Sequence, residues 1–151
     1  LDLYGASGPS ASLIKNWAGY SARYKKTVPV STLDNVLAGR FLGQKLFVKM
    51  DVEGAEFSVL KGALNTISQM PKPVWLLEIC LNEFHPQGRN PDFLSIFQLF
   101  WDYGYKAYTV SSAPRVIDQA EVSNWFSNGH AETENFNYIF VDPDDAMNFL
   151  S

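Results

Sequence analysis

Carboxylates and one imidazole are the side chains of this sequence that are best suited to chemistry. Three carboxylates stand together in DVEGAE (51–56), Glu78 interrupts the apolar run VWLLEICL (74–81), and His85 lies in the loop LNEFHPQGRN (81–90). Carboxylates and imidazoles accept protons as general bases, and carboxylate oxygens bind hard cations. These residue types therefore predict proton abstraction from an acceptor or a carboxylate cation site.

Several of these side chains also have a purely structural explanation, and the sequence leaves both interpretations open. Glu53 and Glu56 follow a predicted strand at a helix N-terminus, where negative charge is favoured by about 0.3–1 kcal/mol. Lys49 alternates with Asp51 on one face of that strand, so a salt bridge is the simpler expectation for this pair. Asp51 ends a buried strand, and we therefore expect its carboxylate to be partly desolvated. His85, in a loop with no evident partner, is expected at the surface.

The same residues also decide whether the sequence predicts a metal site. Asp51, Glu53 and Glu78 could converge on a hard cation. The sequence has a single cysteine, Cys80, and no His-x-x-x-His pair, so it predicts no zinc site and no internal disulfide. We assign no metal ligand from the sequence.

Two apolar strands must position the carboxylates. LFVKMDV (46–52) and VWLLEICL (74–81) have apolar residues on both faces, which is typical of buried parallel strands. Between them, Gly54 allows a sharp turn, and an apolar stripe from Phe57 to Ile67 predicts one helix that ends before Pro71. In open α/β sheets ligands bind outside the carboxyl ends of the strands, so we expect Asp51, Glu53, Glu78 and His85 to gather there.

The remaining elements are predicted by caps, breakers and periodicity. The sequence indicates a strand at VPV (28–30), a helix from Ser31 or Thr32 to Leu37, and a helix from Asn90 and Pro91 to Gly104. Further elements are a strand at 105–110, a short helix bracketed by Asp118 and Glu121, and a strand at 136–142, which we expect to be antiparallel. Residues 1–27 are rich in glycine and serine, and we expect a poorly ordered or irregular lead-in.

Strands that alternate with helices predict an α/β fold with a mainly parallel sheet and one antiparallel strand near its edge. The 151 residues suit one domain. A net charge of −4 with no basic stripe predicts no nucleic-acid partner. Neither an apolar run near 20 residues nor a signal peptide is visible. We expect a cytoplasmic protein without a membrane partner.

Three segments carry a family resemblance: VPVSTLDNVL (28–37), FVKMDVEGAEFSVLKGAL (47–64) and PVWLLEI (73–79). Together they resemble the FkbM family of methyltransferases, and the resemblance extends over roughly residues 1–142. It implies a Rossmann-like class I methyltransferase sheet that binds S-adenosylmethionine and methylates a hydroxyl of a sugar, a polyketide or another small molecule. The resemblance places Asp51 beside the methyl donor and the acceptor. Asp51 or His85 is then the candidate base, and Glu53 and Glu78 are candidates for orienting the acceptor or holding a cation.

The sequence departs from that family in one respect. The glycine-rich first strand-turn and the acidic ribose-binding residue of the family do not occur, so 1–151 resembles the C-terminal part of the domain. We expect the main cofactor site upstream of residue 1, and no appreciable binding of S-adenosylmethionine or activity by these residues alone. Two alternatives stay open: a non-catalytic binding module and a hydrolase with a carboxylate metal site.

Overall fold

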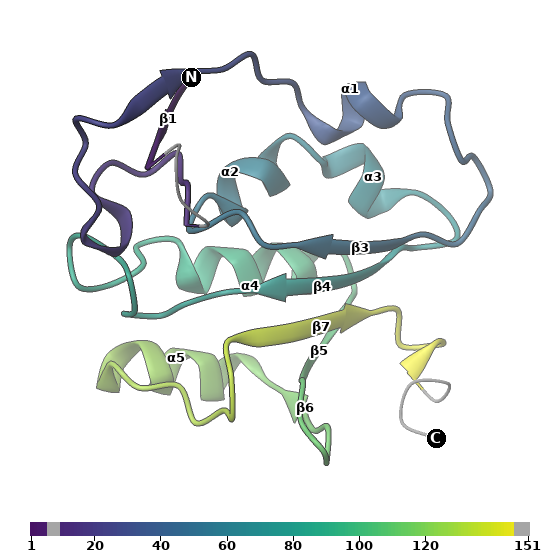
Figure 1. The fold of residues 1–151 in the computed structure, drawn as a ribbon. Coiled ribbons are helices and arrows are strands. Elements are labelled where there is room, and N and C mark those ends of the chain that lie inside the picture. Colours follow the sequence, from purple (N-terminus) through teal and green to yellow (C-terminus); the bar gives the residue numbers. More distant parts are fainter. Residues whose placement is uncertain (6–9, 147–151) are drawn as a thin grey trace.

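The computed structural model describes residues 1–5 and 10–146, which fold around a five-stranded sheet. Its strands are β3 (Phe47–Met50), β4 (Val74–Glu78), β5 (Lys106–Thr109), β6 (Val116–Ile117) and β7 (Asn137–Val141). They are ordered β3-β4-β7-β5-β6 across the sheet (Figure 1). A separate antiparallel pair, β1 (Asp2–Tyr4) and β2 (Lys25–Thr27), lies near the N-terminus.

The sheet is mixed rather than mainly parallel. β3 and β4 are adjacent and parallel, as the sequence predicts, whereas β7 is antiparallel to both β4 and β5. β5 therefore runs in the same direction as β4, but the two strands are not adjacent because β7 lies between them. The prediction of an antiparallel strand at 136–142 is confirmed. Its expected place near the edge is wrong, because the short β6 forms the edge instead.

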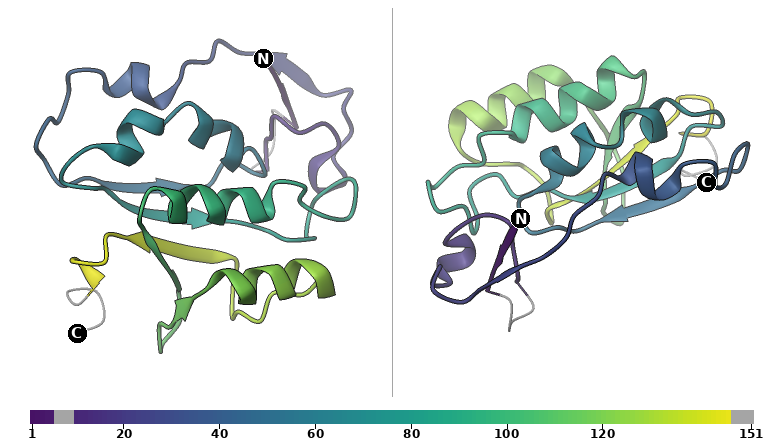
Figure 2. Two further views of the ribbon diagram at one scale, coloured as in Figure 1. Left: turned by 180° about the vertical axis from the view of Figure 1, so that it is seen from behind. Right: turned by 90° about the horizontal axis from the view of Figure 1, so that it is seen from above.

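The helices lie mainly along one face of this sheet. They are α2 (Glu56–Lys61), α3 (Leu64–Ser68), α4 (Phe93–Asp102) and α5 (Gln119–Asn128), with the shorter α1 (Leu33–Leu37) and the 3-10 helix η1 (Trp17–Gly19) further out. The view from above in Figure 2 shows α4 and α5 side by side on the same side of the strands. Their apolar stripes face the sheet, which buries one continuous core.

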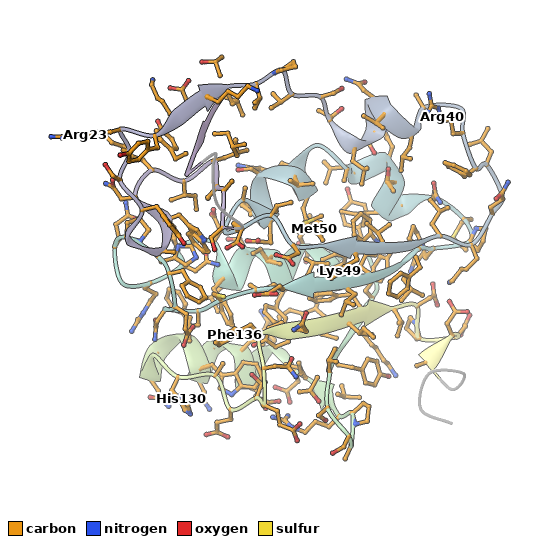
Figure 3. All side chains as sticks on the ribbon, in the orientation of Figure 1. Arg23, Arg40, Lys49, Met50, His130 and Phe136 are labelled. Atoms are coloured by element: carbon orange, nitrogen blue, oxygen red, sulfur yellow. The ribbon has the colours of Figure 1, made fainter. Side chains whose placement is uncertain are left out.

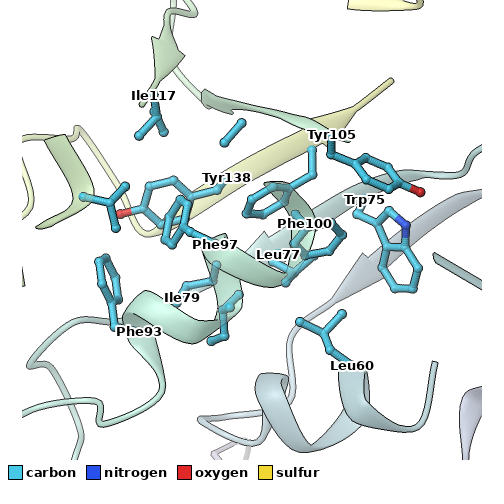
Figure 4. Packing of buried hydrophobic residues seen from close by; sticks show 14 of the residues in the cluster. Leu60, Trp75, Leu77, Ile79, Phe93, Phe97, Phe100, Tyr105, Ile117 and Tyr138 are labelled. Atoms are coloured by element: carbon cyan, nitrogen blue, oxygen red, sulfur yellow. The ribbon is translucent and has the colours of Figure 1, made fainter. Parts of the chain in front are cut away.

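Aromatic rings dominate that core (Figure 4). The ring of Phe100 on α4 stacks on Phe140 of β7 with 4.0 Å between centroids, and it meets Trp75 of β4 edge-on at 5.7 Å. Phe97 contacts Tyr138 edge-on at 5.0 Å. Such pairs contribute about 0.5–1.5 kcal/mol each beyond the burial of their area, so this layer fixes α4 on the strands that carry the site.

The opposite face of the sheet is less covered by the described residues. Phe47 is 58 % exposed, and Leu76 and Ile139 are only half-buried. Val74, Tyr108 and Val141 form a smaller apolar cluster there, joined by Ala146. No helix in the described part of the chain has the length and hydrophobicity that a membrane span requires.

Two elements of the structure differ in extent from those that the sequence predicts. The helix expected after Gly54 is two helices, α2 and α3, because the chain leaves helical geometry at Gly62 and Ala63. Glycine at such a position lowers helix stability by about 1 kcal/mol relative to alanine, and Cβ-free Gly62 lies close to Thr32. The apolar spacing fits one helix, but tertiary packing divides it.

The strand expected at VPV (28–30) is wrong by a few residues. The strand is β2 at 25–27, whose residues pair with β1 in the register Asp2↔Thr27. Pro29 lacks a backbone N–H and cannot donate to a ladder, which explains why the strand ends before it. Residues 1–27 thus include β1, η1 and β2, although the structure describes only 1–5 and 10–27 of that range.

Two of the predicted helix caps are confirmed, and a third differs. The side chain of Thr32 accepts a hydrogen bond from the Asn35 amide at the start of α1, and Asp118 accepts one from the Glu121 amide at the start of α5. Asn90 instead accepts from the amide of Asp92 and forms a turn, so α4 begins at Phe93. Capping residues of this kind stabilise helices by roughly 1 kcal/mol.

Candidate functional site

The carboxyl ends of β3 and β4 bring the acidic residues together. The parallel register pairs Met50 with Leu77, so the residues that follow these strands lie at one edge of the sheet. Asp51, Glu53 and Glu78 line a small cavity there, together with Trp17, Gly54, Glu56 and Cys80. Figure 3 shows Lys49 and Met50 on β3 beside β4, whereas His130 lies apart on the far side of β7.

Asp51 is the most open of these carboxylates. Its side chain is 41 % exposed, and its Oδ2 accepts from Nζ of Lys49 at 2.9 Å. The predicted salt bridge is therefore confirmed. Asp51 is less buried than its place at the end of an apolar strand suggests, because β3 is an edge strand of the sheet that the described residues form.

Glu53 is held by the N-terminal segment. Its Oε2 accepts from the indole Nε1 of Trp17 at 2.6 Å, and its backbone carbonyl accepts from Oγ of Ser12 at 2.5 Å. Its backbone is left-handed, with φ of 52°. Non-glycine residues in this region are strained by about 1–3 kcal/mol, so the turn is kept by the contacts made from outside it.

Gly54 makes that contact with Trp17 possible. Its φ is 89°, and a Cβ built there would lie 2.4 Å from Cζ3 of Trp17 and 2.7 Å from Cδ1 of Ile14. Any side chain at this position would displace the indole. The glycine of DVEGAE is therefore required by close packing as well as by the turn.

Glu56 is the most deeply buried of the acidic residues. It is 3 % exposed, and its Oε1 accepts from the amide of Gly54 at 3.0 Å. Burial raises the pKa of Glu56, while hydrogen bonds from backbone amides, including that of Gly54, oppose the shift and the charge of Asp51 adds to it. The protonated form of Glu56 is thus favoured by the fold.

Glu78 lies at the end of β4 and is half-buried. Burial raises the pKa of Glu78, with further contributions from the charges of Asp51 and Glu53 and opposition from Lys49. Raised pKa values of carboxyl groups, as at Glu56 and Glu78, are typical of sites for proton transfer, although structural networks show them too.

His85 does not line the carboxylate cavity. Its ring meets the ring of Trp17 edge-on at 4.6 Å, so the indole stands between the imidazole and the carboxylates. His85 is 7 % exposed, and its Nε2 is buried with no hydrogen-bond partner in 1–5 or 10–146. The expected surface position is wrong. Burial lowers the pKa of His85 against the opposing charges of Asp92 and Glu83.

Cys80 lines the same cavity as the carboxylates and is buried. Burial raises the pKa of its thiol to about 12, and the surrounding glutamates add to the shift. Thiolates, not thiols, are nucleophiles. Cys80 is therefore a small buried side chain rather than a nucleophile.

Trp17 is the residue of this site that the sequence did not identify. It stands in the irregular lead-in, yet it is 3 % exposed and contacts Glu53, Gly54 and His85. Its residue type could have indicated burial, because the large aromatic side chain of a tryptophan is rarely left in solvent. Glu56 was interpreted only as a helix-terminal charge, because its burial depends on how α2 packs and not on its neighbours in the sequence.

The described residues contain no group of three or more histidine, cysteine, aspartate or glutamate side chains arranged to hold a metal ion. A family model described as the methyltransferase FkbM domain matches residues 3–107. No curated protein and no solved structure matches the chain. The matched range includes β3, β4, DVEGAE, Trp17 and His85.

Proposed function

Because the chain belongs to the FkbM methyltransferase domain family, whose model matches more than two thirds of it, we propose that it methylates a hydroxyl oxygen. The proposed methyl donor is S-adenosylmethionine, and the proposed acceptor is a small molecule such as a sugar or a polyketide. The family match carries this proposal. It is supported by carboxylates at the carboxyl ends of two adjacent parallel strands, where ligands bind in open α/β sheets.

Asp51 is the proposed base. It is the exposed carboxylate of the site, and Lys49 holds only its Oδ2. We assign Oδ1 to the acceptor, whose hydroxyl proton would pass to it as the oxygen becomes nucleophilic. General bases of this kind contribute about 10²–10⁴ in rate.

Glu78 is proposed to orient the acceptor rather than to take its proton. Its carboxyl group lines the same cavity as Asp51 at the end of β4, where it can hydrogen-bond an acceptor hydroxyl. Glu53 is bound to Trp17, so its proposed role is to hold the turn and the indole in place. His85 is the second candidate base. It ranks after Asp51 because its buried Nε2 would meet an acceptor only after a rearrangement.

The cavity among the carboxylates cannot hold a nucleotide by itself. The cavity among the carboxylates has a volume of about 10 Å³, whereas small-molecule and cofactor pockets span roughly 300–1,000 Å³. S-adenosylmethionine supplies the methyl group when bound, and we propose that residues outside 1–151 contribute most of its affinity. β3 pairs only with β4 in the described part of the chain, so its other edge is open to such an addition.

Two measurements test the proposal. Titration calorimetry with S-adenosylmethionine should detect no appreciable binding by 1–151, and micromolar binding would contradict the division of the cofactor site. Transfer of a labelled methyl group to a panel of hydroxylated acceptors should require a longer chain that carries the cofactor segment. Binding of acceptors without any transfer would favour the alternative of a non-catalytic module.

In that active chain, Asp51→Asn should lower methyl transfer about a hundredfold while cofactor affinity stays unchanged. The matched control is Asp142→Asn. Asp142 is also a lysine-paired carboxylate that follows a strand, with Lys72 at 3.1 Å, but it lies at the opposite end of the sheet. Unchanged turnover in Asp51→Asn would return Asp51 to the role of a surface ion-pair partner.

A further inference from the structure

Trp17 separates two hollows of unequal size. On its inner side lies the carboxylate cavity of about 10 Å³, which includes Glu56, Glu78 and Cys80. On the outer side lies a shallow groove of about 560 Å³, lined by Asn16, Ala18, Gly19, Phe84, His85 and Pro86. The outer groove is large enough for a small molecule, whereas the inner cavity holds about one water molecule. The indole and the imidazole stand between them.

The indole is closely seated but attached through few groups. Its N–H donates to Oε2 of Glu53 at 2.6 Å, and its ring lies against the Cα of Gly54, where no Cβ would fit. Loss of this single hydrogen bond would leave packing alone to hold the ring.

The segment that carries the indole, residues 12–19, is here called the strap. Besides the indole N–H, its hydrogen bonds to other segments are one from Oγ of Ser12 to the Glu53 carbonyl at 2.5 Å and one from the Ala18 amide to the Phe84 carbonyl at 2.9 Å. The backbones of Ser12 and Tyr4 also exchange two hydrogen bonds, at 2.8 and 3.0 Å, at the start of the strap. Asn16 and Ala18 are left-handed, with φ of 64° and 49°. Segments with few backbone hydrogen bonds and strained residues open locally before the rest of a protein unfolds.

Opening of the strap would relieve the unfavourable burial of two polar groups. Nε2 of His85 has no partner in the described structure, and an unpartnered buried nitrogen is costly. Glu56 is a buried carboxyl whose charged form is disfavoured by burial. Withdrawal of the indole would expose both groups to the same space, next to Glu78.

We propose that Trp17 is a gate residue that decides which acceptors reach the carboxylates. With the indole seated, Asp51 is exposed, Glu53 and Glu78 are half-buried, and Glu56 is buried. When the strap lifts, the outer groove and the inner cavity join, and His85, Glu56 and Glu78 face one site. This inference rests on the proposed function only for the identity of the molecule that enters.

Cys80 reports the gate directly. It is the only cysteine of the 151-residue chain, it lines the inner cavity, and it is 6 % exposed. Its labelling by methyl methanethiosulfonate, a small uncharged reagent, measures how often the cavity opens. In the native protein we expect labelling through a local opening, with a rate that depends less on urea than global unfolding does.

Trp17→Ala should raise the labelling rate by roughly 10- to 100-fold in native conditions. The matched control is Trp101→Ala, which removes a half-buried indole from α4, away from the site, and should leave the rate of Cys80 unchanged. Ser12→Ala is a milder variant that keeps Trp17 but removes the hydroxyl that binds Glu53 and the Ile14 amide. It should raise the rate several-fold, and it decides the question if Trp17→Ala does not fold.

The gate is wrong if Cys80 labels only through global unfolding in the native chain and in Ser12→Ala, and if Trp17→Ala labels no faster than Trp101→Ala. The labelling needs neither a methyl donor nor an acceptor. Absence of methyl transfer in the longer chain would therefore remove the proposed function without affecting this result, and the reverse also holds.

Discussion

Two regions of this molecule differ in how they are built, although β4 contributes to both. In the aromatic core, Phe97, Phe100 and Phe140 are fully buried and meet one another in ordinary ring geometries. At the turn after β3, Glu53 has a left-handed backbone and Glu56 is a buried carboxyl. The first region is held by apolar packing, although the buried indole nitrogen of Trp75 has no hydrogen-bond partner in the described residues. The second combines a strained backbone with a buried carboxyl.

The difference separates a region that stabilises the fold from one that costs free energy and that we propose to be functional. Apolar packing gains free energy from each buried ring. A strained carboxylate turn beside an unpartnered His85 nitrogen loses free energy, and it persists only because the surrounding structure stabilises it. Violations of this kind gather at functional sites. The following predictions test the contrast, from the largest expected effect to the smallest.

Removing a core ring should have the largest effect. Phe100→Ala should lower the free energy of unfolding by about 3–5 kcal/mol, because it deletes a fully buried ring that contacts Trp75, Tyr105 and Phe140. Phe47→Ala is the control on the open face and should change stability little, since Phe47 is 58 % exposed. Urea unfolding of both variants checks this, and equal losses would mean that the two faces are packed alike.

A methyl group at Gly54 should have the next largest effect. Gly54→Ala should cost about 2–4 kcal/mol, because it combines a left-handed backbone with a clash against Trp17. Gly39→Ala shares the positive φ, at 70°, but has nothing within 4 Å, so it should cost about 1 kcal/mol. Thermal and urea unfolding give the difference, and a Gly54→Ala variant no less stable than Gly39→Ala would show that Trp17 is loosely seated.

Removal of an ordinary helix cap should have a smaller effect on stability. Asp118→Ala should cost about 1 kcal/mol, because its side chain caps α5 by accepting from the Glu121 amide. Asp92→Ala is the matched control, since Asp92 precedes α4 without a side-chain cap. Should Asp92→Ala prove as costly as Asp118→Ala, helix capping would not be the source of the loss.

The smallest effect is a change in pH dependence. Burial raises the folded pKa of Glu56 above its ordinary value of 4.5. The stability that its protonated form provides is complete below the unfolded pKa and is lost as the pH rises through the folded pKa. Glu56→Gln stays neutral, so its free energy of unfolding should fall less between pH 4 and pH 7 than that of the native chain. Glu132→Gln, at an exposed position, should keep the native pH dependence.

Much of the fold followed from local patterns in the sequence. The parallel pair of LFVKMDV and VWLLEICL, the antiparallel strand at 136–142 and the cap at Asp118 were all predicted, because each depends on periodicity or on a side chain near its own backbone. The position of β7 inside the sheet was not. Strand order depends on which edges remain free after distant segments pair, and no local pattern records that.

The candidate site divides in the same way. The sequence placed Asp51, Glu53 and Glu78 at one sheet edge, because parallel strands end together. It also predicted the Lys49 ion pair from alternation along β3. It did not predict that Asp51 would be exposed and His85 buried, because both properties depend on what covers them.

The sequence by itself therefore determined the residue types of the site and the strands that present them, since both are encoded within short stretches of chain. Only the tertiary structure decided that Trp17, more than thirty residues before Glu53 in the sequence, would close the cavity over Glu56 and separate it from His85. Closure of a loop between such distant segments depends on the free energy of the whole packed arrangement. The physical reason is that burial, and with it the protonation of Glu56 and His85, is a property of neighbours in space.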